Sequence, residues 1–160
     1  MTSLVDITIR NCRNYLECIL EIENLSFPSP WSLKAFKEEI GNPISHLWGL
    51  TVDEVLTGYT CFCMFDIEIQ LINLAVHPHE RGKGFGHYFL TKMIESAVSK
   101  GKKYIWLEVR PSNLAALRLY EKSGFDAVDR RPQYYADTHE DAIVMALTLS
   151  SERGYHLASN

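Results

Sequence analysis

The feature that most constrains this 160-residue chain is the stretch over residues 72–86, which reads INLAVHPHERGKGFG. An apolar run typical of a strand ends in a proline-containing turn, and a basic, glycine-rich loop then leads into a helical pattern that starts near His87. Backbone N–H groups at a helix start have no intrahelical partner and carry the positive end of the helix dipole, so we expect this loop to bind phosphate. Alternating glycines allow the chain to turn its amides inward, and Arg81 and Lys83 add positive charge.

Two common phosphate-binding loops do not fit this spacing. A nucleoside-triphosphate loop needs Ser or Thr directly after its lysine, whereas Lys83 is followed by Gly84. A dinucleotide fold needs G-x-G-x-x-G, whereas Gly82, Gly84 and Gly86 alternate strictly. What remains is Arg81-x-x-Gly84-x-Gly86 between a strand and a helix. Taken alone, this motif leaves open a simple glycine turn with solvated charges.

Length and composition indicate a single globular domain. We expect it to span residues 1–149, followed by a polar tail over residues 150–160. Hydrophobic residues make up 46% of the sequence, and no apolar run approaches the ~20 residues of a membrane span. The N-terminus lacks the charged start and apolar core of a signal peptide, so we expect a cytoplasmic protein without a membrane partner.

Charge and cysteine content argue against two further classes. A net charge of −4 does not favour binding to nucleic acid. The four cysteines form no C-x-x-C pair, and Cys61 and Cys63 stand two apart in a strand-like run, where their side chains share one face. We therefore expect these two to be small core residues, and we expect no metal site.

Apolar periodicity predicts the strands of an α/β fold. Alternating residues predict strands over residues 5–10, 46–52, 55–64 and 67–76, and the last three are expected to form an antiparallel meander. A nearly continuous apolar run predicts a strand over residues 104–109 that is buried on both faces. Residues 126–131 and 142–149 are predicted to complete the sheet as an antiparallel pair.

Helical spacing predicts four helices around this sheet. They are expected after Asn11 and Ser32, which act as N-caps, from near His87 to Gly101, and from Asn113 to Ser123. The predicted architecture is a mixed central sheet of about seven strands with an N-terminal antiparallel meander and helices on both faces.

The β-α-β-α order around the glycine loop predicts where chemistry takes place. Strands joined by a crossover helix are parallel, and ligands bind beyond their carboxyl ends, so Leu74-Ala75-Val76 is expected near the end of the strand that carries Glu108. A carboxylate in an apolar strand costs desolvation energy unless it is paired, and such a group suits a general base. The alternative, in which Glu108 pairs with Arg110 and is structural, stays open.

Other polar and aromatic residues allow two interpretations each. Tyr120 could donate a proton to a leaving group, or it could simply pack beside Leu117 and Phe125. Asn113 caps its helix or bonds a cofactor, and Glu68 is either solvated or directed into a cleft. In FPSPWS, Phe27 and Trp31 form a hydrophobic plug between two helices or a wall that contacts substrate.

Four segments together resemble the GCN5-related N-acetyltransferase (GNAT) family, and in particular its members that acetylate the N-terminal alanine of bacterial ribosomal proteins: FPSPWS, LINLAVHPHERGKGFG, WLEVRPSNLAALRLYEKSGF and RRPQYYADTHEDAIVMAL. The resemblance implies the GNAT fold, acetyl-coenzyme A (acetyl-CoA) as donor, Glu108 as proton acceptor and Tyr120 as proton donor, without a metal. It also implies these cofactor-binding positions: Leu74, Ala75, Val76, Arg81, Gly82, Lys83, Gly84, Phe85, Gly86, His87 and Asn113.

The expected acceptor is the N-terminal α-amino group of a protein, a ribosomal protein by this resemblance. Residues expected to contact it are Phe27, Trp31, Glu68, Tyr134 and Tyr135. The sequence departs from its relatives at Gly82, where Arg or Gln is common, and at Ala136, where a proline usually follows the paired tyrosines. Two alternatives stay open: a GNAT enzyme acting on lysine or a small amine, and a non-catalytic module that binds acyl-CoA.

Overall fold

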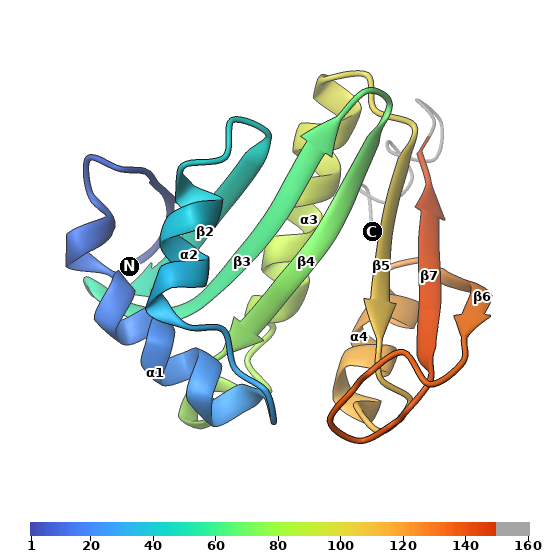
Figure 1. Cartoon of the computed structure of the whole chain (residues 1–160). Coiled ribbons are helices and arrows are strands. Elements are labelled where there is room, and N and C mark those ends of the chain that lie inside the picture. Colours follow the sequence, from blue (N-terminus) through green and yellow to red (C-terminus); the bar gives the residue numbers. More distant parts are fainter. Residues whose placement is uncertain (150–160) are drawn as a thin grey trace. The chain divides into compact units, whose positions relative to one another are not determined.

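The computed structural model describes residues 1–149, so the predicted polar tail lies outside the described residues. This part of the chain forms a seven-stranded mixed sheet in the order β1-β2-β3-β4-β5-β7-β6 (Figure 1). The strands are β1 (Thr2–Ile7), β2 (Ser45–Val52), β3 (Val55–Phe65), β4 (Glu68–Val76), β5 (Tyr104–Val109), β6 (Asp126–Arg131) and β7 (Ala142–Thr148). The helices are α1 (Leu16–Ser26), α2 (Leu33–Ile40), α3 (Phe85–Ser99) and α4 (Leu114–Lys122), with 3-10 turns η1 (Cys12–Asn14) and η2 (Pro78–Glu80). The predicted α/β class and the mixed sheet are confirmed.

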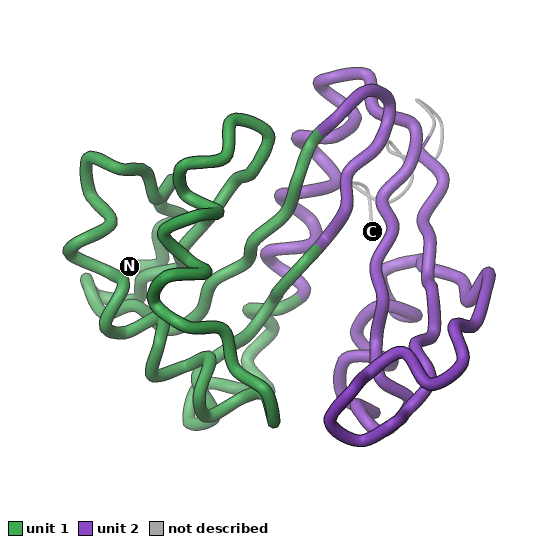
Figure 2. Tube along the Cα trace, viewed as in Figure 1, with its two compact units in different colours: residues 1–64, 72–86 green, residues 65–71, 87–160 purple. Residues whose placement is uncertain are grey.

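The chain divides into two compact units (Figure 2). Unit 1 contains residues 1–64 and 72–86, and unit 2 contains residues 65–71 and the described residues from 87 onward. Strand β4 contributes its first residues to unit 2 and its last residues to unit 1. The glycine-rich loop therefore belongs to unit 1, and Glu108 and Tyr120 belong to unit 2.

Unit 1 is an antiparallel sheet covered by two helices. β1 pairs with β2 and β2 pairs with β3, both antiparallel. Asp53 and Glu54 join β2 to β3 with φ angles of 49° and 70°, which is the left-handed geometry of a tight hairpin. In Figure 1, α1 and α2 lie together on one side of β2 and β3. The antiparallel pairing predicted for the first two strands of the meander is thus confirmed for β2 and β3.

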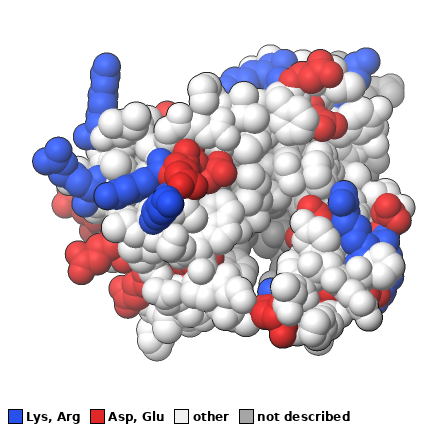
Figure 3. Space-filling view, in the orientation of Figure 1, with Lys and Arg blue, Asp and Glu red and all other residues white. Residues whose placement is uncertain are grey.

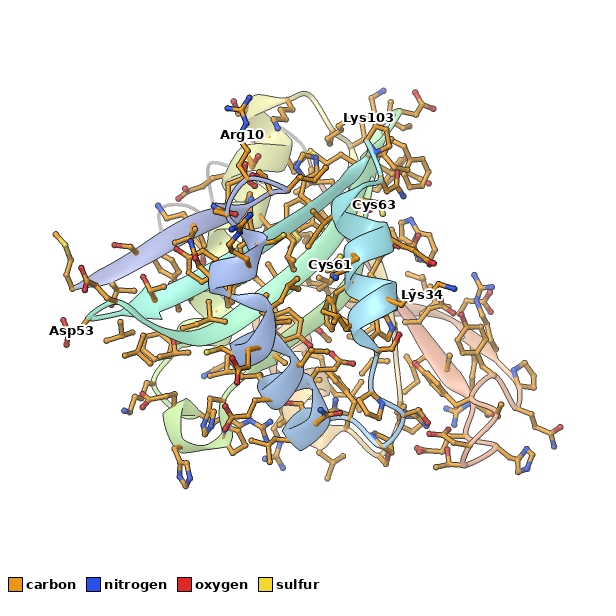
Figure 4. The ribbon with its side chains drawn as sticks, turned by 60° about the vertical axis from the view of Figure 1, so that its left-hand side comes forward. Arg10, Lys34, Asp53, Cys61, Cys63 and Lys103 are labelled. Atoms are coloured by element: carbon orange, nitrogen blue, oxygen red, sulfur yellow. The ribbon has the colours of Figure 1, made fainter. Side chains whose placement is uncertain are left out.

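The core of unit 1 forms where these helices meet the sheet. Phe36 of α2 and Tyr59 of β3 are both fully buried, and their rings meet edge-on at 5.7 Å between centroids. Cys61 and Cys63 are also buried, as predicted, and Figure 4 shows both on β3 alongside α2. Ser32 caps α2 by accepting a hydrogen bond from Ala35 N, so this predicted N-cap is confirmed.

Unit 2 contains the parallel part of the sheet. The start of β4 pairs with β5 over three residue pairs, from Glu68 opposite Tyr104 to Gln70 opposite Trp106. β7 lies between β5 and β6 and is antiparallel to both. In Figure 1, α4 lies behind β5 and β7. Buried side chains of α3 and β5, including Phe89, Met93 and Ile105, form the core of this unit.

The predicted start of the chain is wrong in two respects. The first strand is Thr2–Ile7 rather than residues 5–10, because the chain turns at Thr8, whose carbonyl accepts from Cys12 N at 2.9 Å. Asn11 does not cap a helix, since its Oδ1 accepts from Thr8 N and its Nδ2 donates to Asp6 O. Its amide is used to close the turn, and α1 begins only at Leu16.

The prediction that β5 is buried on both faces is also wrong. Its side chains alternate, and Ile105, Leu107 and Val109 are buried whereas Tyr104 is 41% exposed. Glu108 lies on the more open face of the strand, which explains how a carboxylate fits into an apolar run. Among the described residues, no helix is both long enough and apolar enough to span a membrane.

Gly49 in β2 leaves no room for a side chain. A Cβ there would lie 2.7 Å from Leu56 Cδ1 and 3.0 Å from Ile7 Cδ1, and both neighbours are buried. We expect Gly49→Ala to lower the free energy of unfolding by about 1 to 2 kcal/mol, because packed side chains must move. Gly41→Ala is the matched control, since its Cβ would meet nothing closer than 3.6 Å. Chemical denaturation of both variants tests this, and equal stabilities would contradict it.

Candidate active site

The glycine-rich loop of unit 1 connects the buried end of β4 to the start of α3. Ala75 and Val76 are buried, and Leu74 is half-buried. Gly82 and Gly84 have φ angles of +81° and +86°, which side chains rarely adopt. A Cβ at either position would meet no atom within 4 Å, so these glycines are required by backbone conformation and not by lack of space.

The cationic side chains of this loop are engaged within unit 1. Arg81 Nε donates to Val76 O at 2.9 Å, and Arg81 Nη2 donates to Ser26 Oγ at 3.0 Å. Lys83 Nζ lies 2.7 Å from Glu80 Oε2. Arg81 therefore ties the loop to the end of β4 and to the end of α1. An anion bound at this loop would be held first by backbone amides, with the side chains as supports.

Glu108 in unit 2 faces an arginine that the sequence did not indicate. Its side chain is 13% exposed, and its Oε2 lies 3.3 Å from Arg131 Nε at the end of β6. Oε2 is nevertheless buried without a hydrogen bond in the described part of the chain. The alternative pairing of Glu108 with Arg110 is not found, because Arg110 forms two hydrogen bonds of 2.9 Å to the carboxylate of Asp137.

The paired tyrosines of the loop between β6 and β7 lie close to Glu108. Their rings are perpendicular, with 5.1 Å between the centroids of Tyr134 and Tyr135. Burial raises the pKa of Tyr134, and the charge of Glu108 and its hydrogen bond with the phenol raise it further. Burial also raises the pKa of Tyr135 to about 12, although Arg110, 3.9 Å from the ring centroid, acts in the opposite direction.

Tyr120 lies in the last part of α4 and is 7% exposed. Its ring packs at 5.8 Å from that of Phe125, so the predicted packing role is real. Burial raises the pKa of Tyr120, and the neighbouring Tyr135 raises it further. The phenol therefore keeps its proton at neutral pH, which is the state that a proton donor needs.

The remaining candidates lie in different surroundings. Asn113 Oδ1 accepts from Ala116 N at 3.2 Å, so this residue caps α4 as one interpretation predicted. Phe27 and Trp31 are partly buried against the core of unit 1, which agrees with a hydrophobic plug. Glu68 is half-buried at the start of β4. His87 is exposed in the first turn of α3, whose first two residues are Phe85 and Gly86.

Sequence reasoning missed Arg131 and Arg110 as organisers of the site in unit 2. Arg131 stands in RRPQYYADTHED, where charged residues flank the paired tyrosines, and this clustering was the available signal for it. Arg110 directly follows the strand that carries Glu108, and nothing near it in sequence indicates its bonds to Asp137. Among the described residues, no group of three or more His, Cys, Asp or Glu side chains is placed to hold a metal ion. On the face drawn in Figure 3, acidic and basic side chains are interspersed and separated by uncharged areas.

The fold and this set of residues define an acyltransferase: the chain belongs to the acetyltransferase (GNAT) family, whose model matches residues 16–125. The [ribosomal protein bS18]-alanine N-acetyltransferase of Salmonella typhimurium is 38% identical over 132 residues, covering 81% of this chain and 88% of that protein. The putative enzyme of the same name from Bacillus subtilis is 34% identical over 144 residues, covering 89% and 95%.

A solved structure agrees with these relatives. The crystal structure of the ribosomal-protein-S18-alanine N-acetyltransferase from Escherichia coli matches with a TM-score of 0.84 and 32% identity, over 94% of this chain and 95% of that one. The predicted family and fold are thereby confirmed.

The contact between Glu108 and Tyr134 can be tested by titration. We expect Glu108→Gln to lower the pKa of Tyr134, because the variant removes a negative charge that disfavours the phenolate. The measurement is an NMR titration that follows the Tyr134 ring carbon. Glu121→Gln on the exposed surface of α4 is the matched control and should leave that pKa unchanged. An unchanged Tyr134 pKa in Glu108→Gln would show that the two side chains do not interact in solution.

Proposed function

We propose that this protein transfers the acetyl group of acetyl-CoA to the N-terminal α-amino group of a protein, with an alanine-starting ribosomal protein as acceptor. Membership of the acetyltransferase family supports the acetyl transfer. Relatives that cover most of the chain and are named for the alanine of ribosomal protein bS18 support the choice of acceptor.

The glycine-rich loop is the proposed binding site for the pyrophosphate of coenzyme A. Its positive φ angles turn successive amides toward one side, and α3 adds the N–H groups of its first turn. Arg81 fixes the carbonyl of Val76, and so holds the end of β4 in place. We assign Leu74, Ala75 and Val76 to the pantetheine arm, with a main-chain N–H near Val76 stabilising the oxyanion of the tetrahedral intermediate.

Glu108 is the proposed general base, and the observation that carries this role is its buried Oε2 without a hydrogen bond. An unsatisfied, buried carboxylate oxygen is costly, and an incoming ammonium group would relieve that cost. Glu108 takes a proton from the acceptor ammonium, directly or through a water. The freed nitrogen lone pair then attacks the thioester carbonyl and forms the new C–N bond.

Tyr120 is the proposed general acid for the second half of the reaction. When the tetrahedral intermediate collapses, the C–S bond breaks and the leaving sulfur takes the phenolic proton. The raised pKa of Tyr120 keeps that proton available at neutral pH. Direct transfer in this way needs no covalent acetyl-enzyme, in line with the burial of Cys61 and Cys63 in the core of unit 1.

The acceptor is tested by offering acetyl-CoA with three classes of amine while thiol release is followed. These are basic peptides that start with alanine, lysine peptides with a blocked N-terminus, and small amines. We expect rapid release with the first class alone. Thiol release only with lysine peptides, or only with small amines, would show that this amine is the acceptor and that the proposed N-terminal acceptor is wrong. If acetyl-CoA binds but no class of amine causes thiol release, the protein is a coenzyme-binding module and the proposed acetyl transfer is wrong.

The assignment of base and acid predicts two different pH effects. Glu108→Gln should lower kcat/KM by about 10²-fold or more near pH 6 and by less near pH 9, because an α-amine with pKa near ~8 loses its proton unaided at high pH. Tyr120→Phe should lower kcat over the whole pH range in which the enzyme is assayed, because the raised pKa of Tyr120 keeps the native phenol protonated throughout.

Glu121→Gln serves as the control for both variants, since this side chain is exposed on α4. A Glu108→Gln variant with native rates across the pH range would remove Glu108 from the mechanism. Glu68 would then be the next residue to substitute.

A further inference from the structure

A second buried carboxylate lies in unit 1. Glu23 of α1 is only 1% exposed, although its place in the helical pattern is one that an apolar residue would normally occupy. Burying a carboxylate is expensive unless hydrogen bonds replace the water that it loses. Glu23 therefore needs an explanation in terms of its partners.

Each oxygen of Glu23 accepts hydrogen bonds from other segments. Oε1 accepts from the hydroxyl of Tyr59 in β3 and from Nδ2 of Asn73 in β4, the latter at 3.0 Å. Oε2 accepts from the backbone N of Trp31 at 2.9 Å. Burial raises the pKa of Glu23, while these three donors act in the opposite direction. Because the carboxylate is enclosed and engaged, it is unsuited to take a proton from a substrate.

The same residue also holds the other end of the loop that contains Trp31. The backbone carbonyl of Glu23 accepts from Phe27 N at 3.1 Å. Between these two amides the chain reads Pro28-Ser29-Pro30, and a proline has no N–H to donate. The backbone amides at both ends of this five-residue segment are thus bound by one residue, one through its main chain and one through its side chain.

This arrangement orients two aromatic side chains. Phe27 and Trp31 pack against the core of unit 1, and the Trp31 ring lies 5.3 Å from that of Phe36 between centroids. Without the bond to Oε2, the backbone would be hydrogen-bonded to Glu23 at Phe27 but not at Trp31, and ring packing alone would hold Trp31. We expect the direction of the aromatic surface to be less well fixed in that case.

We propose that Glu23 is a positioning residue that fixes the Phe27–Trp31 loop and thereby sets the affinity for the acceptor. This inference rests on the proposed function, in which that loop contacts the acceptor. It assigns Glu23 to acceptor binding and not to the chemical step.

Three variants separate this role from a general effect on stability. Glu23→Leu removes the acceptor for Trp31 N, whereas Tyr59→Phe removes a different donor and leaves the bond to Trp31. Glu23→Gln keeps one oxygen for Trp31 N, because the Tyr59 hydroxyl can turn, and the Asn73 amide can flip, to accept from the new amide group. The last two are therefore the matched control and the conservative rescue.

The kinetic expectation is a selective change in acceptor KM. We expect Glu23→Leu to raise KM for an alanine-starting peptide about tenfold, the scale of one lost hydrogen bond to a charged group, with kcat and the KM for acetyl-CoA within about twofold of native. Tyr59→Phe and Glu23→Gln should keep the native acceptor KM. An equal rise in KM for Tyr59→Phe and Glu23→Leu would overturn the proposal.

Amide hydrogen exchange tests the positioning without any turnover. In the native protein the Trp31 amide should exchange much more slowly than an unprotected amide, and Glu23→Leu should abolish this protection. Rapid exchange at Trp31 in the native protein would overturn the proposal, even if Glu23→Leu does not fold. If no amine is acetylated, the proposed function fails, but the exchange result still decides whether Glu23 holds the loop.

Discussion

The cost of placing a carboxylate away from water determines how this protein uses its two enclosed glutamates. Glu23 has every oxygen engaged by donors from neighbouring segments, and it serves the architecture of unit 1. Glu108 keeps one buried oxygen without a hydrogen bond, although Arg131 lies close to it. An unsatisfied hydrogen-bond acceptor inside a protein costs free energy. The fully bonded Glu23 therefore stabilises the fold, whereas the unbonded oxygen of Glu108 would favour the binding of a cationic ligand.

In the glycine-rich loop, the side chains and the backbone amides also have separate roles. Its charged side chains are used to hold the loop, with Arg81 bound to a carbonyl and a hydroxyl and Lys83 bound to Glu80. In the proposed coenzyme site the backbone amides would bind the phosphate, because the positive φ angles of Gly82 and Gly84 allow turns that residues with side chains rarely adopt. The proposed binding would then depend more on backbone geometry than on formal charge.

Much of the fold was predictable because local signals agreed with one another. Residues 126–131 form the predicted strand, and Asp53-Glu54 forms the predicted hairpin, since turn chemistry and strand periodicity coincide there. The family was recognised from motifs in four segments, of which no single one was sufficient. The prediction that Asn11 caps a helix is wrong, because an Asn or Asp side chain that closes a turn cannot be told in sequence from one that caps a helix.

What escaped prediction depends on contacts between distant segments. Nothing local distinguishes the pairing of Glu108 with Arg131 from a pairing with its sequence neighbour Arg110. The registers of β5 and of β6 against β7, which lies between them, bring Arg131 to Glu108. Nothing in the sequence near Glu23 indicates its role, because its partners come from residues 31, 59 and 73. The roles of Glu108, Tyr120 and the cofactor-binding positions in catalysis remain predictions.

The two bonds that Glu23 makes to the Phe27–Trp31 segment have a consequence for the diversity of such enzymes. A short segment whose two ends are both hydrogen-bonded to one residue can change in sequence between those ends. Substitutions at Pro28 and Pro30 leave both anchoring amides in place, so the surface of the segment can be altered while its two hydrogen bonds to Glu23 are kept. Selection, or an engineer, can thus change what the loop contacts without rebuilding the sheet behind it.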